Sequence, residues 1–214
     1  MTERLICLLI GYVCGLFQTS YIYGRAHGID IRNYGSGNAG TTNALRTLGA
    51  KAGAITFLGD CFKCVIAVLI VRVIFGNSHH DVIRLLGLYA AAGTILGHNF
   101  PFYLKFRGGK GIAATAGLLV SFDWRVTLAA LIVFLIVFFT THYVSLGSLL
   151  VYAVFLAGLV ILGQTGQFDM PRGALYEMYV VAALLAILAV YKHRANIQRL
   201  IHGNENKTYL RKKK

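Results

Sequence analysis

Charged residues are scarce in this chain of 214 residues. Asp, Glu, Lys and Arg together make up 14% of it, whereas hydrophobic residues make up 57%. A soluble domain usually carries about a quarter charged residues. The deficit therefore argues against an ordinary soluble domain and favours an integral membrane protein.

Carboxylates are the scarcest charged groups, with 8 Asp and Glu against 21 Lys and Arg. A membrane metallohydrolase or a CDP-alcohol transferase needs clustered carboxylates to hold a divalent ion. The aspartates here are scattered along the sequence, at Asp30, Asp60, Asp81, Asp123 and Asp169. The sequence therefore predicts neither of these enzyme classes, and we expect no metal or other cofactor.

Several catalytic motifs are also missing. No Gly-x-Ser-x-Gly occurs, which argues against an α/β-hydrolase serine nucleophile. Lys110 is followed by Gly111 and has no glycine at the required distance upstream, so it does not belong to a Walker A loop. None of the seven histidines has an aspartate five positions later, so the His-x4-Asp arrangement of many glycerolipid acyltransferases is absent.

The four cysteines all lie in apolar segments, at Cys7, Cys14, Cys61 and Cys64. The last two form a Cys-x2-Cys pair, but no second pair or Cys/His partner follows at zinc-ligand spacing. We expect buried free thiols rather than a metal site or a disulfide.

Apolar segments of about 20 residues are long enough to cross a bilayer as helices. The sequence predicts an all-α polytopic membrane protein with seven transmembrane helices, at residues 5–23, 52–75, 82–100, 112–121, 126–140, 144–163 and 175–191. The first has no small-residue cleavage site after it and is expected to be retained. The fourth is short, so six crossings are the alternative.

The formal net charge of +13 is distributed unevenly among the predicted loops. With the N-terminus outside and the C-terminus in the cytoplasm, the outer side holds only Arg4, Arg84, Arg125 and Arg172. We therefore assign the positive charge to cytoplasmic loops and anionic lipids, and not to nucleic-acid binding. Residues 1–214 are expected to form a single domain with a basic cytoplasmic tail at 203–214, whose last four residues, RKKK, would contact lipid headgroups.

A few polar or small residues inside the predicted spans have structural explanations. Asp60 and Lys63 are three positions apart, so they can pair on one helix face, and Arg72 can extend to the outer surface. Other small residues suit close helix packing, namely Gly87, Gly93, Gly97, Gly147 and Ser148.

The segment YGSGNAGTTNALR (residues 34–46) is the first of three polar, basic patches between the apolar spans. Its glycines let backbone N–H groups converge, and a following helix N-terminus would add partial positive charge, so the segment resembles an anion-binding loop. The candidate donors are Ser36, Gly37, Asn38, Thr42, Asn43 and Arg46. The alternative is a plain connector in which Ser36 or Asn38 caps a helix and Thr42 and Asn43 belong to its first turn.

The second patch, GHNFPFYLKFRGGKG (residues 97–111), ends in a flexible cationic turn at Gly108, Gly109 and Lys110. The third, residues 191–207, places His193 and Asn196 on one face of a helix. All three patches are predicted on the cytoplasmic face. Such residues suit binding of phosphorylated small molecules, with electrostatic stabilisation as the main catalytic effect.

In their order and spacing, GSGNAGTTN, GHNFPFYLKFRGGKG and HRANIQRLIHGNENK resemble the three signature motifs of the bacterial PlsY family. The resemblance implies seven spans in the bacterial inner membrane and a cytoplasmic active site. It implies transfer of an acyl group from acyl phosphate to glycerol 3-phosphate, giving lysophosphatidic acid and inorganic phosphate, in the first committed step of phospholipid synthesis. The expected partners are these substrates, membrane lipids and the soluble enzyme that makes acyl phosphate.

The resemblance also assigns residues. Ser36, Lys110, His193 and Asn196 would be catalytic. Substrate binding would involve Gly37, Asn38, Thr42, Asn43, Arg46, Gly108 and Gly109. Within this set, Ser36, Gly37, Asn38 and the 108–110 turn would hold the acyl-phosphate phosphate, and Arg46, Lys110, His193 and Asn196 would hold glycerol 3-phosphate.

Two positions depart from the family pattern. Cys64 replaces the glycine of the family's Asp-x-x-Lys-Gly pattern, so close helix packing at this position is in doubt. His142 replaces a basic residue before Tyr-Val-Ser-Leu-Gly-Ser. The base could be a substrate phosphate oxygen or His193, and His98 could brace a helix end or touch substrate. A transporter of an organic phosphate is the alternative function, although such proteins usually bind near the midplane and often contain repeats.

Overall fold

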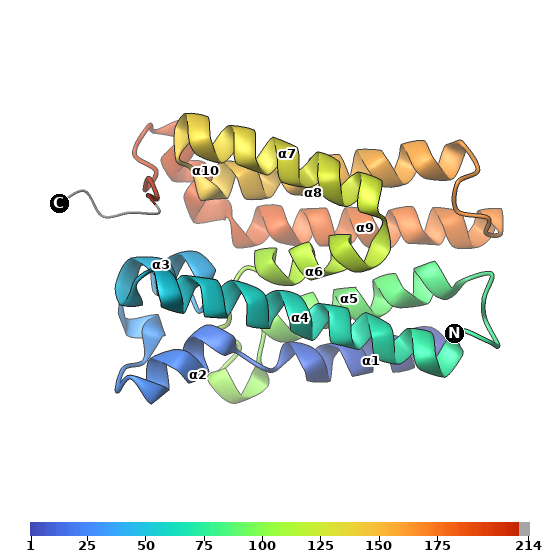
Figure 1. Ribbon diagram of the computed structural model, residues 1–214, viewed down its shortest axis with the longest axis horizontal. Coiled ribbons are helices and arrows are strands. Elements are labelled where there is room, and N and C mark those ends of the chain that lie inside the picture. The colour runs from blue at the N-terminus through green and yellow to red at the C-terminus, as the bar shows by residue number, and fades with distance from the viewer. Residues whose placement is uncertain (210–214) are drawn as a thin grey trace. The chain divides into compact units, whose positions relative to one another are not determined.

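The computed structural model describes residues 1–209, and all the regular secondary structure in this range is helical (Figure 1). Five helical stretches are long and apolar enough to cross a membrane, at Thr2–Ala26, Ala50–Phe75, Trp124–Thr141, Val144–Gln164 and Arg172–Lys192. The chain is thus a multi-pass, all-α membrane protein. It divides into two compact units, Met1–Phe122 (unit 1) and the chain from Asp123 onward (unit 2).

Unit 1 is a bundle with shorter helices gathered at one end (Figure 1). The bundle contains α1 (Thr2–Gly15), α4 (Ala50–Phe75), α5 (Ile83–Asn99) and α6 (Ile112–Phe122). The short helices are α2 (Thr19–Ala26), α3 (Thr41–Leu48) and the 3₁₀ turns η1 (Ile31–Asn33) and η2 (Phe102–Leu104). The first two polar patches lie among these short elements.

The described part of unit 2 is also a bundle of helices (Figure 1). They are α7 (Trp124–Thr141), α8 (Val144–Gln164), α9 (Arg172–Lys192) and α10 (Arg194–Ile201). Helix α8 packs against both α7 and α9, while α10 packs on α8 and α9. The third polar patch lies at the α9–α10 junction.

Each predicted span is found to be helical, but two are short. Helix α5 has 17 residues and α6 has 11, so neither meets the length of the five longer stretches. The first predicted span, 5–23, lies within the stretch Thr2–Ala26, in which the helix is interrupted between Gly15 and Thr19. The number of crossings and the orientation stay predictions.

The interruption after α1 is stabilised by side chains that replace the lost helical hydrogen bonds. The Gln18 amide nitrogen donates to the Gly15 carbonyl at 3.1 Å, and the Lys63 ammonium donates to the Phe17 carbonyl at 2.6 Å. Lys63 also pairs with Asp60 at 2.9 Å, which confirms the predicted pairing on one face of α4. Terminal helix carbonyls need such partners where water is excluded.

Helices α1 and α5 approach closely through glycines on both sides. A Cβ added to Gly93 would overlap the Leu8 carbonyl oxygen, and one added to Gly11 would overlap that of Ala90. Gly97 meets the backbone of Tyr12 in the same way. The predicted packing role of Gly93 and Gly97 is confirmed, since small residues allow this backbone contact.

Substitution of Gly93 by valine should therefore separate α1 from α5. We expect a loss of about 1–3 kcal/mol or more, because overpacking a tight contact forces backbone shifts. Thermal unfolding in detergent measures the effect as a lower Tm. Gly173→Ala is the control, because a Cβ there meets nothing within 4 Å; equal Tm values for the two variants would contradict the close approach.

Cys64 does not prevent close packing of α4. Its side chain is fully buried, and a Cβ added to Gly117 of α6 would lie 2.9 Å from the Cβ of Cys64. That Cβ would also overlap the Cys61 carbonyl oxygen. The small residue that permits the approach is therefore supplied by α6, and the doubt raised by Cys64 is removed.

Candidate active site

The first patch forms a loop that is held by the side chain of Asn43. This residue is buried in the first turn of α3, where its amide nitrogen donates to the carbonyls of Ile31 and Tyr34 at 3.0 Å each. Its amide oxygen accepts from the Ser36 backbone N–H at 2.9 Å. Asn43 thus braces the loop from within, a role that the sequence prediction of a binding donor did not include.

Helix α3 begins at Thr41 with Gly40 as its N-cap, and no side chain caps it. The alternative in which Ser36 or Asn38 caps the helix is therefore not found. Ser36 and Gly37 are exposed, and Gly37 has a positive φ of 71°, a conformation that favours glycine. Thr42 lies in the first turn of α3, as the connector alternative expected.

A hydrogen bond from Arg32 joins the segment before the first loop to the second patch. The Arg32 guanidinium binds the Asp30 carboxylate at 2.6 and 2.9 Å and also donates to the Leu104 carbonyl at 3.1 Å. The hydrogen bonds from Arg32 lower the pKa of Asp30 below its ordinary value. The carboxylate therefore stays ionised at neutral pH and holds Arg32 in place.

The second loop lies on the end of α5 and meets the first. The Gly109 N–H donates to the His98 carbonyl at 3.1 Å. A Cβ on Gly109 would lie 2.9 Å from the Ala39 carbonyl oxygen and would overlap the His98 ring. The structure thus brings Gly109 against the loop that carries Ser36, Gly37 and Asn38.

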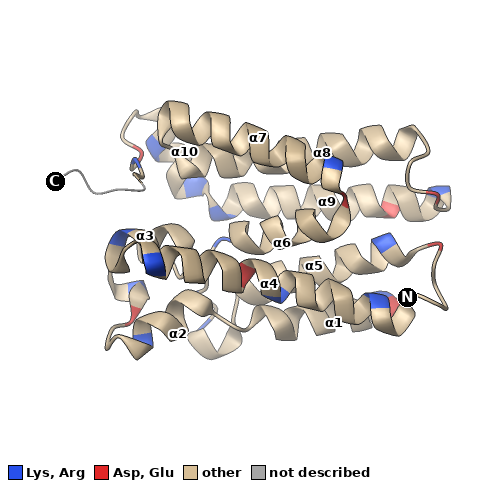
Figure 2. Ribbon diagram, in the orientation of Figure 1, with Lys and Arg blue, Asp and Glu red and all other residues tan. Residues whose placement is uncertain are grey.

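Basic residues are most numerous near these loops. In Figure 2, the Lys and Arg residues of unit 1 gather around α2 and α3, and those of unit 2 gather around α10. Arg46 and Lys110 are half-buried, on α3 and at the 108–110 turn respectively. Within unit 1, the predicted phosphate ligands thus belong to two loops in contact.

The third patch is folded around two buried polar residues. His193 is 3% exposed and separates α9 from α10, and its Nδ1 lies 2.8 Å from the Ala189 carbonyl. Because a carbonyl only accepts, Nδ1 donates, and in the neutral ring Nε2 then carries the lone pair. The Asn196 amide nitrogen donates to the Glu205 carboxylate at 2.8 Å.

Glu205 was not singled out from the sequence, although it belongs to the third motif. It is 8% exposed and also accepts from Arg199 at 2.9 Å, so a single carboxylate orients both Asn196 and Arg199. An acidic residue in a strongly basic segment was the available signal.

Glu205→Ala should destabilise unit 2 and misplace Asn196. We expect a cost of about 1–3 kcal/mol, because the buried Asn196 amide loses its acceptor. Glu205→Gln should cost less, since its amide oxygen can still accept from Asn196. The Tm in detergent measures both variants, and an unchanged Tm in Glu205→Ala would show that the carboxylate is not needed.

The chain after α10 folds back onto the α7–α8 corner. The Thr208 N–H donates to the His142 carbonyl at 2.9 Å, and the His142 ring lies 4.7 Å from that of Tyr209. Residues 204–209 of the predicted tail therefore pack against unit 2, and His142 serves here as a packing residue. The RKKK segment lies outside the described residues.

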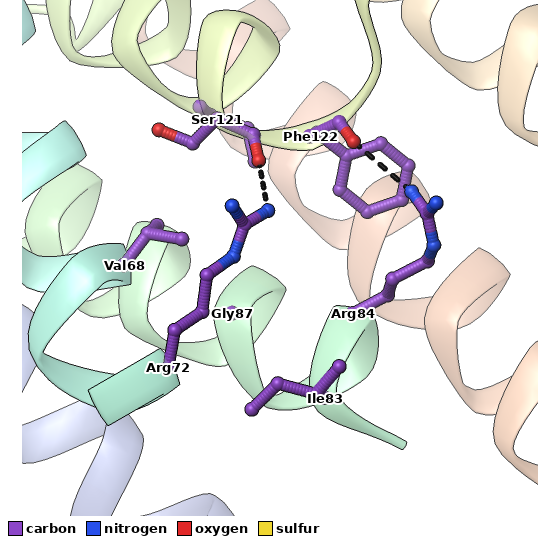
Figure 3. Close-up of a pocket in the computed structure, with 8 residues that line it drawn as sticks. Val68, Arg72, Ile83, Arg84, Gly87, Ser121 and Phe122 are labelled. Carbon is purple, nitrogen blue, oxygen red and sulfur yellow. Dashed lines mark hydrogen bonds between the residues drawn. The ribbon is translucent and has the colours of Figure 1, made fainter. Parts of the chain in front are cut away.

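A shallow pocket at the far end of α6 contains none of the predicted site residues (Figure 3). Arg84 donates to the Phe122 carbonyl at 3.1 Å, and Arg72 donates to that of Ser121. The two arginines thus bind the terminal carbonyls of a short helix. This contact explains Arg72, which the sequence predicted only to extend to the surface.

The sequence model of the family described as glycerol-3-phosphate acyltransferase matches residues 5–203. The chain belongs to the glycerol-3-phosphate acyltransferase (PlsY) family. A protein of that name from Clostridioides difficile is 41% identical over 204 residues, covering 95% of this chain and 94% of the relative. Glycerol-3-phosphate acyltransferase 2 of Thermotoga maritima is 37% identical over 207 residues and covers 96% of each chain.

Solved structures give the same PlsY assignment. The glycerol 3-phosphate form of PlsY (YgiH), an integral membrane enzyme, has a TM-score of 0.80 and 30% identity, with 96% of each chain covered. The lysophosphatidic acid form has a TM-score of 0.77 and 29% identity, covering 97% of this chain and 96% of the other. The predicted PlsY membership is confirmed.

Proposed function

We propose that this PlsY-family protein transfers an acyl group from acyl phosphate to glycerol 3-phosphate. The products are 1-acyl-glycerol 3-phosphate and inorganic phosphate. The observation that carries the proposal is the contact of Gly109 with Ala39, because it brings together the two loops that contain the predicted phosphate ligands Ser36 and Lys110. Its relatives are named for the same acceptor.

The reaction needs no covalent enzyme intermediate, because acyl phosphate is already activated. The acceptor hydroxyl oxygen forms a bond to the acyl carbon, the bond from that carbon to the phosphate oxygen breaks, and phosphate leaves with the electron pair. Proximity and donors at the developing oxyanion and at the leaving phosphate lower the barrier. We assign the leaving phosphate to Ser36, Gly37, Asn38, Gly108, Gly109 and Lys110.

Glycerol 3-phosphate is assigned to Arg46, Lys110, His193 and Asn196. The tautomer of His193 supports this role, since Nδ1 is held by Ala189 and Nε2 can accept a proton from the acceptor hydroxyl. A phosphate oxygen of the substrate is the second candidate base. Asn43 supports the loop from the first turn of α3, and we assign its neighbour Thr42 to substrate binding.

The cellular setting follows from charge and substrates. The excess of Lys and Arg in the loops around the site supports a cytoplasmic orientation of that face in a bacterial inner membrane. The apolar bundle would receive the acyl chain, and the soluble enzyme that makes acyl phosphate would deliver the donor. The lipid product belongs to the first committed step of phospholipid synthesis.

The test is phosphate release by the purified protein in detergent or liposomes. Release should require both glycerol 3-phosphate and acyl phosphate, and acyl-CoA should not replace the donor. Uptake of glycerol 3-phosphate into sealed vesicles without phosphate release would favour the transporter instead. Formation of lysophosphatidic acid and free CoA with acyl-CoA in place of acyl phosphate would refute the assigned donor.

Direct transfer has its own test. Rapid acid quench during turnover with radiolabelled acyl phosphate should leave no label on the protein. An acylated Ser36 in the quenched sample would refute direct transfer and would make this serine a nucleophile.

A further inference from the structure

His98 lies directly beneath the contact between the two loops. It is 2% exposed near the end of α5, and its carbonyl accepts from the Gly109 N–H at 3.1 Å and from the Gln18 amide at 3.1 Å. Its ring occupies the space that a Cβ on Gly109 would need, on the side where Ala39 also lies. Both the backbone and the ring of His98 therefore contact the 108–110 turn.

The other edge of the ring is anchored to a buried ion pair. The Lys63 ammonium lies 2.8 Å from His98 Nδ1 and 2.9 Å from the Asp60 carboxylate. Asp60 also accepts from the Thr19 hydroxyl at 3.0 Å, and Lys63 donates to the Gly15 carbonyl at 3.3 Å. The ring is thus attached to α1, α2 and α4 as well as to its own helix.

This arrangement determines the tautomer of His98. An ammonium group can only donate, so Nδ1 accepts from Lys63 and the ring proton is on Nε2. Nε2 is the atom that faces Gly109. A buried, charge-assisted contact on one edge of the ring therefore sets the position of the other edge.

We propose that His98, anchored by Lys63 and Asp60, is a positioning residue that holds the 108–110 turn against the first loop. The inference rests on the proposed function, in which this turn and the first loop hold the acyl-phosphate phosphate. His98 itself does not touch the substrate. Loss of the ring edge should therefore weaken acyl phosphate binding more than glycerol 3-phosphate binding, because Lys110 is the one residue of the turn that we assign to glycerol 3-phosphate.

Two substitutions test the contributions of the two ring edges separately. His98→Asn keeps a polar group near the Nδ1 position, opposite Lys63, but the shorter side chain does not reach Gly109. His98→Gln places its amide near the Nε2 position, and Lys63 retains Asp60 and the Gly15 and Phe17 carbonyls. We expect His98→Asn to raise the KM for acyl phosphate tenfold or more, and His98→Gln to stay within threefold of the wild type.

The control is Tyr12→Phe, which removes a hydrogen bond to the Phe100 carbonyl at the same end of α5 without touching the turn. Its two KM values should stay within twofold of the wild type. In His98→Asn the KM for glycerol 3-phosphate should rise several-fold less than the KM for acyl phosphate. Equal rises in both KM values, or an unchanged KM for acyl phosphate, would overturn the positioning role.

A double-mutant cycle adds a second readout. Gly109→Ala should displace the turn by itself, so adding His98→Asn should cause little further rise in the KM for acyl phosphate. If the two residues acted independently, the fold-rises of the two single variants would multiply in the double variant. If His98→Asn does not fold, a tenfold rise in the KM for acyl phosphate in folded His98→Gln overturns the inference.

The proposed function and this inference fail in different ways. A wild-type protein that releases no phosphate refutes the proposed function. An active wild type whose His98 variants keep the wild-type KM for acyl phosphate refutes only this inference.

Discussion

Lys110→Ala is expected to lower kcat/KM by a factor of about 10² to 10³, the effect of removing one donor from a site that stabilises developing charge. Lys110 directly follows Gly109, which lies against Ala39 of the first loop, and we therefore assign its ammonium to the phosphate. Phosphate release at varied acyl phosphate and glycerol 3-phosphate concentrations measures the loss. Both substrates should be affected, because Lys110 is assigned to both.

Lys105 provides the matched control for charge. It belongs to the same loop and is exposed, directly after η2. Lys105→Ala should keep kcat/KM within about twofold of the wild type, since an exposed charge contributes little. Equal losses in the two variants would mean that general positive charge, and not a specific contact of Lys110, supports the reaction.

His193→Ala should produce the second large loss, about 10² to 10⁴-fold in kcat if its Nε2 is the base. If a substrate phosphate oxygen is the base, His193 acts through glycerol 3-phosphate binding, and the loss should fall mainly on the KM for that substrate. Steady-state kinetics with both substrates varied distinguishes these outcomes. Unchanged kinetics would remove His193 from the site.

His202 is a suitable control for His193 because it makes the same local hydrogen bond but is exposed. Its Nδ1 lies 2.7 Å from the Gln198 carbonyl, which repeats the geometry of His193, but the residue is exposed. His202→Ala should leave both kinetic constants within about twofold of the wild type, as surface substitutions usually do. The comparison therefore separates the effect of losing a ring at the site from the effect of losing its local hydrogen bond.

The helical fold could be predicted because its signals are local. Apolar runs identified the helices, and the i,i+3 spacing of Asp60 and Lys63 predicted their pairing. The break after α1 could not be predicted in this way. It depends on Lys63, 46 residues further along the chain than the Phe17 carbonyl that it binds, so no window of sequence contains both partners.

The site could be predicted as a set of residues but not as a set of roles. Glycine content and basic charge indicated anion-binding loops, and the order of the motifs indicated the family. Asn43, however, was predicted as a binding donor, whereas its amide is used by Ile31, Tyr34 and Ser36. Side-chain amides serve substrates and backbone equally well, so only the folded loop distinguishes the two uses.

Glu205 and His98 illustrate the same limit. Glu205 accepts a hydrogen bond from the predicted site residue Asn196, and the ring of His98 lies against the predicted site residue Gly109. The residue type alone does not show that such a side chain supports another residue of the site. Their importance follows from what they hold in position.

The most direct test of the account is a crystal or cryo-EM structure with glycerol 3-phosphate and a non-hydrolysable acyl phosphonate bound together. We predict that Ser36 and Lys110 contact the phosphonate and that His193 and Asn196 contact glycerol 3-phosphate, with the acceptor hydroxyl next to the acyl carbon. Ligands bound elsewhere, or Ser36, Lys110 and His193 on opposite membrane faces, would contradict the proposed acyl transfer.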